Sequence, residues 1–234
     1  MQLKLLTLNL WRYYDFENRF ENTITEISRL QPDVIFLQEV QIDETLSPFS
    51  QVELLKEKLN AYKYSIHSNI YPKTSQRGVN LEIPVQHGMA VLSKYPIINS
   101  FEYYLKQSEK EKELRSNLCF DINLNEQIIK LANIHFGNKE EWAKKQIQQF
   151  TNYLKNRNET RIMAGDFNMY GLENYKNLYP EYLSSIEFKK YISFPEKNWC
   201  LDYFLIPKTM KFVEIDVIEK YLSDQKGIFG VVEI

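Results

Sequence analysis

The chain has few of the residues that define disulfide-rich, zinc-binding or low-complexity proteins. Of its 234 residues, only two are cysteines, three are histidines, seven are glycines and eight are prolines. Two cysteines cannot form a disulfide framework, and the apolar neighbours of Cys119 and Cys200 predict buried thiols. The histidines show no paired spacing, which disfavours a zinc site. The low glycine and proline content excludes a collagen-like or low-complexity chain.

Long apolar runs and an excess of positive charge are also missing. No stretch approaches the ~20 apolar residues of a transmembrane helix, and the apolar run at the N-terminus has no small-residue cleavage site after it. We therefore predict a cytoplasmic protein without a membrane span. Lys and Arg number 29 against 31 Asp and Glu, a net charge of −2. This balance argues against a strongly basic, non-specific DNA binder, although it is compatible with a local basic patch.

Short apolar runs alternate with amphipathic stretches along the whole chain. Residues 3–10 and 33–40 are mostly apolar, which is typical of strands covered on both faces. Between them an apolar stripe at helical spacing predicts a helix that Pro32 ends. Further helices are predicted at 52–60 and 143–154, and further strands at 89–92, 118–124, 128–136, 161–164, 201–206, 212–218 and 228–234.

More strands than helices, joined by both hairpins and crossovers, predict an α+β fold with mixed sheets and covering helices. No linker, repeat or low-complexity tract divides the chain, so we predict a single domain over residues 1–234. Residues 68–87 interrupt the pattern and contain Pro72, Gly78 and Pro84. We predict a long loop there, and a loop of this length in a compact domain is usually functional or mobile.

Polar side chains stand at the ends of several predicted strands. Burying such a group costs free energy unless it is paired or binds something. If these strands end at one edge of the fold, their polar ends converge in a single cleft. The residues concerned are Asn9, Glu39, His135, Asp166, Asn168, Asp202 and Asp224.

These residue types fit the metal-assisted hydrolysis of a phosphate ester. The oxygens of Glu39, Asn9 and Asp224 suit Mg²⁺, for which Mn²⁺ can substitute. A carboxylate such as Asp166 can orient or deprotonate the attacking water. Asn168 and His135 can donate hydrogen bonds to the phosphoryl oxygens that gain charge in the transition state.

The same positions lie in a set of motifs that resembles a known superfamily. The motifs LTLNLW, QPDVIFLQEV, GMAVLSKYP, NIHFG, MAGDFN and LDYFLI, followed by SDQ, resemble the endonuclease/exonuclease/phosphatase superfamily. That superfamily includes DNase I-like nucleases, apurinic endonucleases, deadenylases, neutral sphingomyelinases and inositol-polyphosphate phosphatases. The resemblance implies a DNase I-like four-layered α/β sandwich, in which two packed mixed β-sheets are flanked by helices and the site lies at one end.

The resemblance also implies a role for individual residues. Glu39 would be the principal metal ligand, and Asn9 would assist it. His135 would bind phosphate, Asp166 would align or activate the water, and Asn168 would contact the phosphate.

One catalytic position departs from the family pattern. Asp202 would normally orient a histidine in a terminal SDH motif, but here the sequence reads Ser223-Asp224-Gln225. A glutamine can donate a hydrogen bond to a phosphoryl oxygen but cannot carry a proton near neutral pH. Three interpretations of Gln225 stay open: a natural member with altered chemistry, a binding relative that has lost catalysis, or an engineered substitution.

Four further residues are candidates for substrate binding. Trp11 and Tyr13 follow Asn9, and aromatic rings beside a phosphate site can stack on nucleobases. Arg77 lies within the predicted long loop and His87 ends it. The main hypothesis is a Mg²⁺-dependent phosphodiesterase acting on nucleic acid. A lipid or small-molecule phosphoesterase and an inactive phosphate-binding relative are the alternatives, and nothing in the sequence implies an oligomer.

Overall fold

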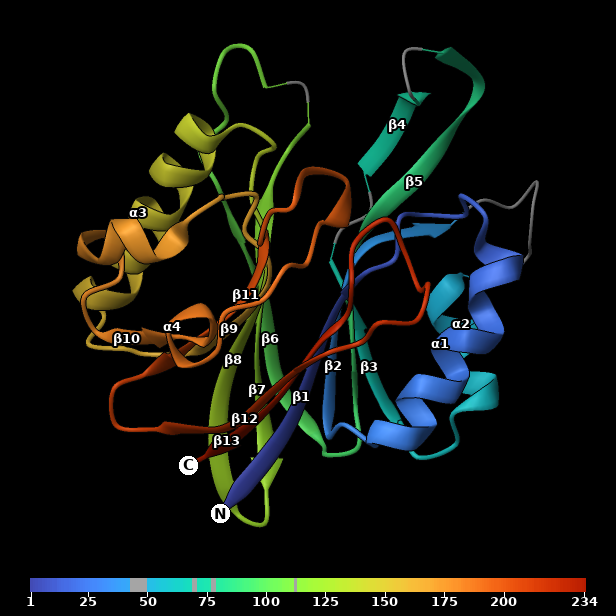
Figure 1. Cartoon of the computed structure of the whole chain (residues 1–234). Coiled ribbons are helices and arrows are strands. Elements are labelled where there is room, and N and C mark those ends of the chain that lie inside the picture. The colour runs from blue at the N-terminus through green and yellow to red at the C-terminus, as the bar shows by residue number, and fades with distance from the viewer. Residues whose placement is uncertain (43–49, 69–70, 77–78, 112) are drawn as a thin grey trace.

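The computed structural model of the chain describes residues 1–42, 50–68, 71–76, 79–111 and 113–234, and for 42, 71–76 and 79–85 it describes the backbone alone. Its strands form two sheets (Figure 1). The first sheet, in the order β12-β13-β1-β2-β5-β3 with β4 paired to β5, contains β1 (Gln2–Asn9), β2 (Val34–Ile42), β3 (Tyr64–His67), β4 (Tyr71–Gln76), β5 (Val79–Ser93), β12 (Lys211–Val217) and β13 (Ile228–Glu233). The second sheet, in the order β10-β11-β9-β8-β7-β6, contains β6 (Ile97–Tyr104), β7 (Ser116–Leu124), β8 (Gln127–His135), β9 (Ile162–Asp166), β10 (Tyr182–Ser184) and β11 (Asp202–Pro207).

Helices cover the outer faces of both sheets. Figure 1 shows α1 and α2 on the first sheet, and α3 and α4 on the second. None of the helices in the described part of the chain is long and apolar enough to cross a membrane. The helices are α1 (Phe16–Leu30), α2 (Gln51–Lys58), α3 (Glu140–Asn156), α4 (Ser185–Phe188) and the 3₁₀ turns η1 (Leu172–Leu178) and η2 (Pro195–Lys197).

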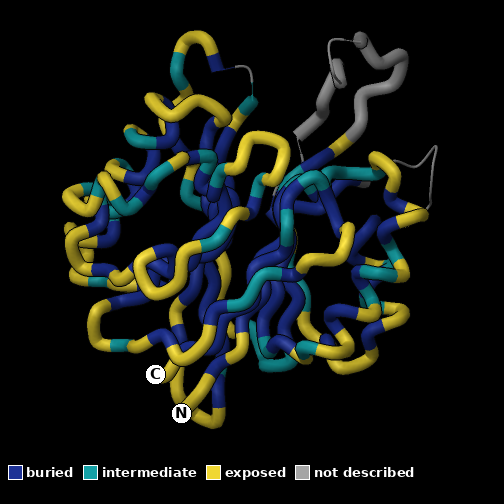
Figure 2. Tube along the Cα trace, viewed as in Figure 1, coloured by how far each residue is buried: buried dark blue, intermediate teal, exposed yellow. Residues whose placement is uncertain are grey.

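The continuous apolar strands of the sequence are explained by burial on both faces (Figure 2). In β1, Leu3 and Leu5 point into the core between the sheets, whereas Leu6 and Leu8 pack under α1 and α2. A third apolar cluster lies between the second sheet and α3. These clusters separate four layers, so the predicted four-layered α/β sandwich is confirmed.

The strand ends that carry the candidate residues meet at one end of the sandwich. β1 and β2 run parallel, as do β8 and β9, so their C-terminal residues share an edge. His135 is in register with Asp166, and Asp166 is in register with Asp202 at the start of β11. The two chain termini lie together at the other end, where the Ile234 amide donates to the Met1 carbonyl at 2.9 Å (Figure 1).

A buried amide bridge joins the two sheets directly beneath this edge. Asn133 of β8 and Gln38 of β2 have no solvent exposure, and Gln38 Nε2 donates to Asn133 Oδ1 at 2.7 Å. Asn133 Nδ2 donates in turn to the backbone carbonyls of Leu37 and Ala90, at 2.9 and 3.0 Å. Gln38 also exchanges hydrogen bonds with the Thr7 hydroxyl of β1. Directional bonds of this kind fix the offset between two sheets that apolar contacts alone would hold less specifically.

The structure corrects one prediction and confirms another. Residues 68–87 are not a long loop, because β4 and the first half of β5 pair as antiparallel strands within them, with Pro72 opposite Gln86. The predicted hairpin after residue 118 is present. Asn125 and Glu126 form its two-residue turn with φ of 51° and 72°, as in the type I′ turns that match the twist of paired strands.

The amide bridge generates a prediction about stability. Replacing Asn133→Leu keeps the branched shape and the number of heavy atoms but leaves the Gln38 side chain without its partner in a dry environment. We expect the free energy of unfolding to fall by about 2–4 kcal/mol, the usual cost of stranding buried polar groups. Chemical denaturation measures this. Asn152→Leu, at an exposed position of α3, is the control, and equal losses in both variants would contradict the role of the bridge.

Candidate active site

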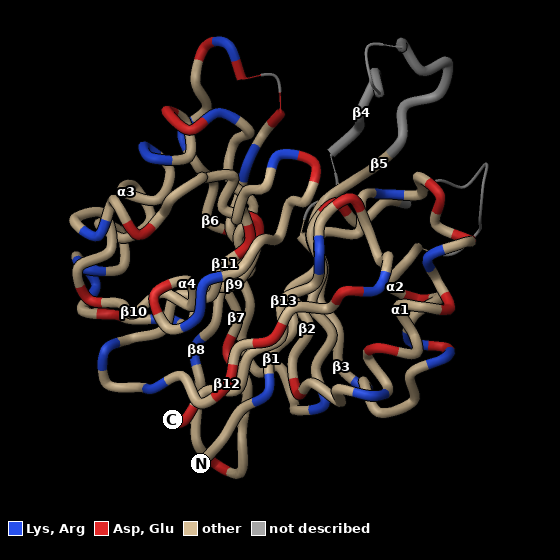
Figure 3. The backbone as a smooth tube through the Cα atoms, viewed as in Figure 1, with Lys and Arg blue, Asp and Glu red and all other residues tan. Residues whose placement is uncertain are grey.

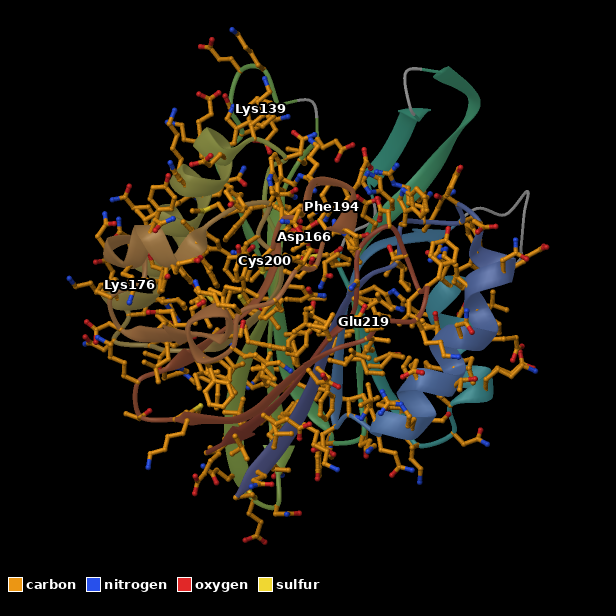
Figure 4. All side chains as sticks on the ribbon, in the orientation of Figure 1. Lys139, Asp166, Lys176, Phe194, Cys200 and Glu219 are labelled. Atoms are coloured by element: carbon orange, nitrogen blue, oxygen red, sulfur yellow. The ribbon has the colours of Figure 1, made fainter. Side chains whose placement is uncertain are left out.

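Asp166 is the centre of the polar cluster. Its side chain is buried, and Figure 4 labels it in the half of the molecule remote from the termini. Asp166 Oδ2 accepts hydrogen bonds from Asn9 Nδ2 at 3.2 Å and from Gln225 Nε2 at 2.9 Å. Oδ1 accepts the backbone amide of Asn168 at 2.9 Å, and His135 Nε2 lies 3.8 Å from Oδ2. Five of the predicted site residues from both sheets therefore meet at one carboxylate.

The motif MAGDFN explains how Asp166 is held. Gly165 adopts a φ of +147°, and a Cβ there would lie 2.0 Å from the Ile134 carbonyl oxygen, so only glycine fits. Asn168 adopts a φ of +51°, and its Nδ2 donates to the Phe136 carbonyl at 2.9 Å. Asparagine tolerates this left-handed conformation better than most residues. The glycine and asparagine thus close a tight turn that aims the carboxylate at the edge of the sheet.

Glu39 stands on a distortion of β2. The pairing of β2 with β5 shifts register between Leu37 and Val40, and Glu39 has a φ of +51°. Such a bulge re-aims a side chain relative to regular pleating. Glu39 Oε2 forms an ion pair with Arg12 Nη2 at 3.1 Å, with side-chain exposures of 18% and 13%. Glu39, the predicted metal ligand, is therefore already paired with the positively charged Arg12 side chain.

Asp202 is the most unusual carboxylate of the site. It is buried opposite Asp166 on the neighbouring strand, and neither of its oxygens has a hydrogen-bond partner among the described residues. Burial, followed by the charge of Asp166, raises the pKa of Asp202 well above its usual value, and the nearby Ser193 side chain opposes this shift only in part. Burial also raises the pKa of Asp166 to about 6, against the hydrogen bonds from Gln225, Asn168 and Asn9 that lower it. Gln225 therefore stabilises the ionised form of Asp166.

The carboxylates of Glu39, Asp166 and Asp224 raise the negative charge of the site, and this favours the binding of a cation. Burial and then the charge of Glu39 raise the pKa of half-buried Asp224, and Glu39 also contributes to the raised pKa of Asp166. Within the described residues no group of three or more His, Cys, Asp or Glu side chains is arranged as a metal site. Mg²⁺, however, usually takes only one or two carboxylates and retains several waters. Glu39, Asp224 and the Asn9 amide oxygen fit Mg²⁺ or Mn²⁺ in donor type, and their role as ligands stays a prediction.

The predicted substrate-binding residues that the structure describes lie on the segment after β1 and in β5. The Trp11 ring packs on Tyr14 at 4.1 Å between centroids, and its backbone amide donates to Asn9 Oδ1 at 2.9 Å. The Tyr13 ring packs edge-on against Phe16 at 5.5 Å. His87 is buried in β5 opposite Gln41, two residues beyond Glu39. Arg77 lies outside the described residues.

Two arginines that support the site were not predicted from the sequence. Arg12 holds Glu39, and its place directly after the first strand-end motif was the available signal. Arg19 of α1 is fully buried and donates to the backbone carbonyls of Leu10 and Leu222, at 3.1 and 2.5 Å. It ties the segment after Asn9 to the segment before Asp224, so the first and last parts of the chain are held together at the site.

Comparison with known proteins agrees with the fold and the motifs. A family model described as "Endonuclease/Exonuclease/phosphatase family" matches residues 6–224. No curated protein matches the sequence significantly.

Solved structures share the fold over almost the whole chain. An endonuclease/exonuclease/phosphatase from Beutenbergia cavernae DSM 12333 is 16% identical with a TM-score of 0.81, covering 100% of this chain and 72% of that one. A family protein from Leptotrichia buccalis C-1013-b is 24% identical with a TM-score of 0.75, over 99% and 100% of the two chains. D. rerio TDP2, complexed with a single-strand DNA product, is 18% identical with a TM-score of 0.72, over 100% and 99%. At these identities the likeness shows the fold alone.

The unpartnered Asp202 predicts a pH-dependent stability. Because its pKa is raised from 3.8 in the folded protein, the folded state keeps a proton that the unfolded chain has lost. The stability that it contributes is full below the unfolded pKa and is lost as the pH rises through the folded pKa, with a slope of about 1.4 kcal/mol per pH unit. Asp202→Asn removes this loss.

We therefore expect the stability of Asp202→Asn relative to the unmodified chain to rise between pH 5 and pH 8, by no more than about 1.4 kcal/mol per pH unit. Denaturation curves at both pH values measure this difference. Asp216→Asn, whose side chain is 46% exposed, is the control. A difference for Asp202→Asn that stays constant with pH would show that Asp202 titrates normally.

Proposed function

Since this chain belongs to the endonuclease/exonuclease/phosphatase family, we propose that it is a divalent-metal-dependent phosphodiesterase acting on nucleic acid. The observation that carries the proposal is the meeting of Asn9, His135, Asn168 and Gln225 around the buried Asp166 carboxylate. A set of hydrogen-bond donors beside a carboxylate and an acidic cation site suits attack of water on a phosphate diester.

The acidic side chains have two roles in this proposal, metal binding and proton acceptance. Glu39, Asp224 and the Asn9 amide oxygen would hold Mg²⁺, which when bound polarises a phosphoryl oxygen as a Lewis acid. Asp166 orients the attacking water and accepts its proton. Its pKa of about 6 leaves it ionised at neutral pH and still basic enough for this task, since a general base works best with a pKa near the working pH.

The neutral and basic donors face the phosphate. His135 donates to a non-bridging oxygen from beside Asp166, and Asn168 contributes the amide hydrogen that its bond to the Phe136 carbonyl leaves available. Donors placed before the reaction stabilise the charge that develops on these oxygens without reorganising.

Gln225 limits the chemistry at the leaving group. Its Nε2 donates to Asp166 Oδ2, so it fixes the base, but an amide cannot protonate a departing alkoxide. Substrates with acidic leaving groups should therefore be favoured over ordinary nucleotide linkages. The buried oxygens of Asp202 and the buried Gln225 Oε1, which lack hydrogen-bond partners among the described residues, support the idea that a histidine in place of Gln225 would find an acceptor.

The charge distribution favours local recognition of the substrate. Figure 3 shows Lys and Arg interspersed with Asp and Glu along the described part of the chain rather than gathered in one extended basic segment. Binding to duplex DNA depends strongly on such a field. A single-stranded or short phosphodiester substrate is therefore the best fit, as in the complex of D. rerio TDP2 with a single-strand DNA product.

The direct test is hydrolysis of a labelled single-stranded oligonucleotide and of bis(p-nitrophenyl) phosphate, with Mg²⁺ or Mn²⁺ and with chelator. We expect cleavage that requires the metal and falls by at least about 10²-fold in Glu39→Gln, because the variant loses a charged ligand. Glu219→Gln, at an exposed position labelled in Figure 4, should retain full activity. Cleavage of sphingomyelin vesicles alone would favour the lipid phosphoesterase, and no hydrolysis of any ester would reject the proposal.

Restoring the family's histidine gives a second prediction. In Gln225→His we expect kcat on the oligonucleotide to rise by about 10²-fold, the lower range for a positioned acid–base group. The gain on bis(p-nitrophenyl) phosphate should be much smaller, because p-nitrophenolate departs without a proton. Steady-state kinetics on both substrates measure the split. Equal gains, or none, would show that Gln225 does not limit leaving-group departure.

A further inference from the structure

We propose that Arg12 is a built-in cation at Glu39 that a divalent metal ion must displace in order to bind. This inference rests on the proposed role of Glu39 as a metal ligand. In this proposal Arg12 sets the affinity for the metal, because it already neutralises the charge of Glu39.

The contact between Arg12 and Glu39 is made by both backbone and side chain. The Arg12 amide donates to the Glu39 carbonyl at 3.1 Å, and Arg12 Nη2 lies 3.1 Å from Glu39 Oε2. Both side chains are more than four-fifths buried, so water screens the pair weakly. Arg12 Nε is buried and has no hydrogen-bond partner among the described residues, which leaves Glu39 as the charged partner of the guanidinium in this part of the structure.

The backbone that presents Arg12 is strained and tightly held. Trp11 and Arg12 adopt consecutive left-handed conformations, with φ of 49° and 55°, which are unfavourable for residues with a side chain. The Arg12 carbonyl accepts Gln51 Nε2 of α2 at 2.6 Å and Arg19 Nη2 of α1 at 3.2 Å. Hydrogen bonds from two helices thus hold the backbone of Arg12 in an unfavourable conformation. Such strain persists only where the surrounding structure enforces it, which indicates that the position of Arg12 has a function.

Electrostatics make Arg12 and a metal ion competitors. The charge of Glu39 already contributes to the raised pKa values of Asp166 and Asp224, so the site is short of positive charge. An arginine cannot leave by losing its proton. A divalent ion could replace it because the ion carries twice the charge, and Asp224 would be its second carboxylate ligand in the proposed site.

The test is the affinity of the full-length chain for Mn²⁺, measured by isothermal titration calorimetry without substrate. Arg12→Met removes the charge and keeps an unbranched apolar side chain. We expect at least about tenfold tighter binding, because the uncompensated Glu39 then interacts only with the metal. Arg29→Met removes an arginine from an ion pair with Glu26 on α1, where the Arg29 side chain is 56% exposed; this control should bind as the unmodified chain does. Unchanged or weaker Mn²⁺ binding by Arg12→Met would overturn the inference.

A second measurement does not depend on the folding of Arg12→Met. Addition of Mg²⁺ to the unmodified chain should shift the ¹⁵N resonance of the Arg12 guanidinium, assigned with Arg12→Lys, while the Arg29 resonance stays in place. An Arg12 resonance that does not move when Mg²⁺ binds would also overturn the inference.

This outcome is separable from the outcome of the activity assays. Tighter Mn²⁺ binding by Arg12→Met with no phosphodiester cleavage by any variant would support the inference and reject the proposed function. Metal-dependent cleavage, with the same Mn²⁺ affinity in Arg12→Met and the unmodified chain, would support the proposed function and reject the inference about Arg12.

Discussion

The buried amide bridge between Gln38 and Asn133 sets the geometry on which the candidate site depends. Gln38 directly precedes Glu39, and Asn133 lies two residues before His135. Apolar contacts between sheets permit small sliding movements, whereas paired amides in a dry core accept one arrangement. The distance from Asn9 on the first sheet to Asp166 on the second is therefore fixed by hydrogen bonds made one layer below. The same hydrogen bonds therefore hold the two sheets together and position the residues of the candidate site.

The site concentrates features that destabilise a folded protein. Asp166 and Asp202 are buried carboxylates on adjacent strands, and burial opposes the ionisation of both. Positive φ values occur at Arg12, Glu39 and Asn168, which are all within reach of the same edge. Folded proteins retain such costs mainly where a ligand or a reaction uses them. The rest of the sandwich, with three apolar clusters, supplies the stability that tolerates them.

Mixed sheets with covering helices and the convergence around Asp166 could be predicted from the pattern of the sequence, whereas the four layers followed from the resemblance to the superfamily. Apolar strands covered on both faces require outer helices, and polar residues at parallel strand ends share an edge. The ion pair of Arg12 with Glu39 could not be predicted, because it depends on a bulge whose position is set by β5. Nor could Asn133 be singled out, since one asparagine in an apolar strand reveals neither its face nor its partner. The extent of β5 was missed because proline and glycine residues marked that region as a loop.

Both cysteines are buried, as their apolar neighbours predicted. Burial raises the pKa of Cys119 to about 12 and also raises that of Cys200, so neither thiol forms the reactive thiolate near neutral pH. A cysteine introduced at a chosen surface position would then be the reactive thiol of the described chain. Fluorophores or spin labels could be attached on either sheet without first removing the native sulfur atoms, and the relative movement of the two sheets could be followed in solution.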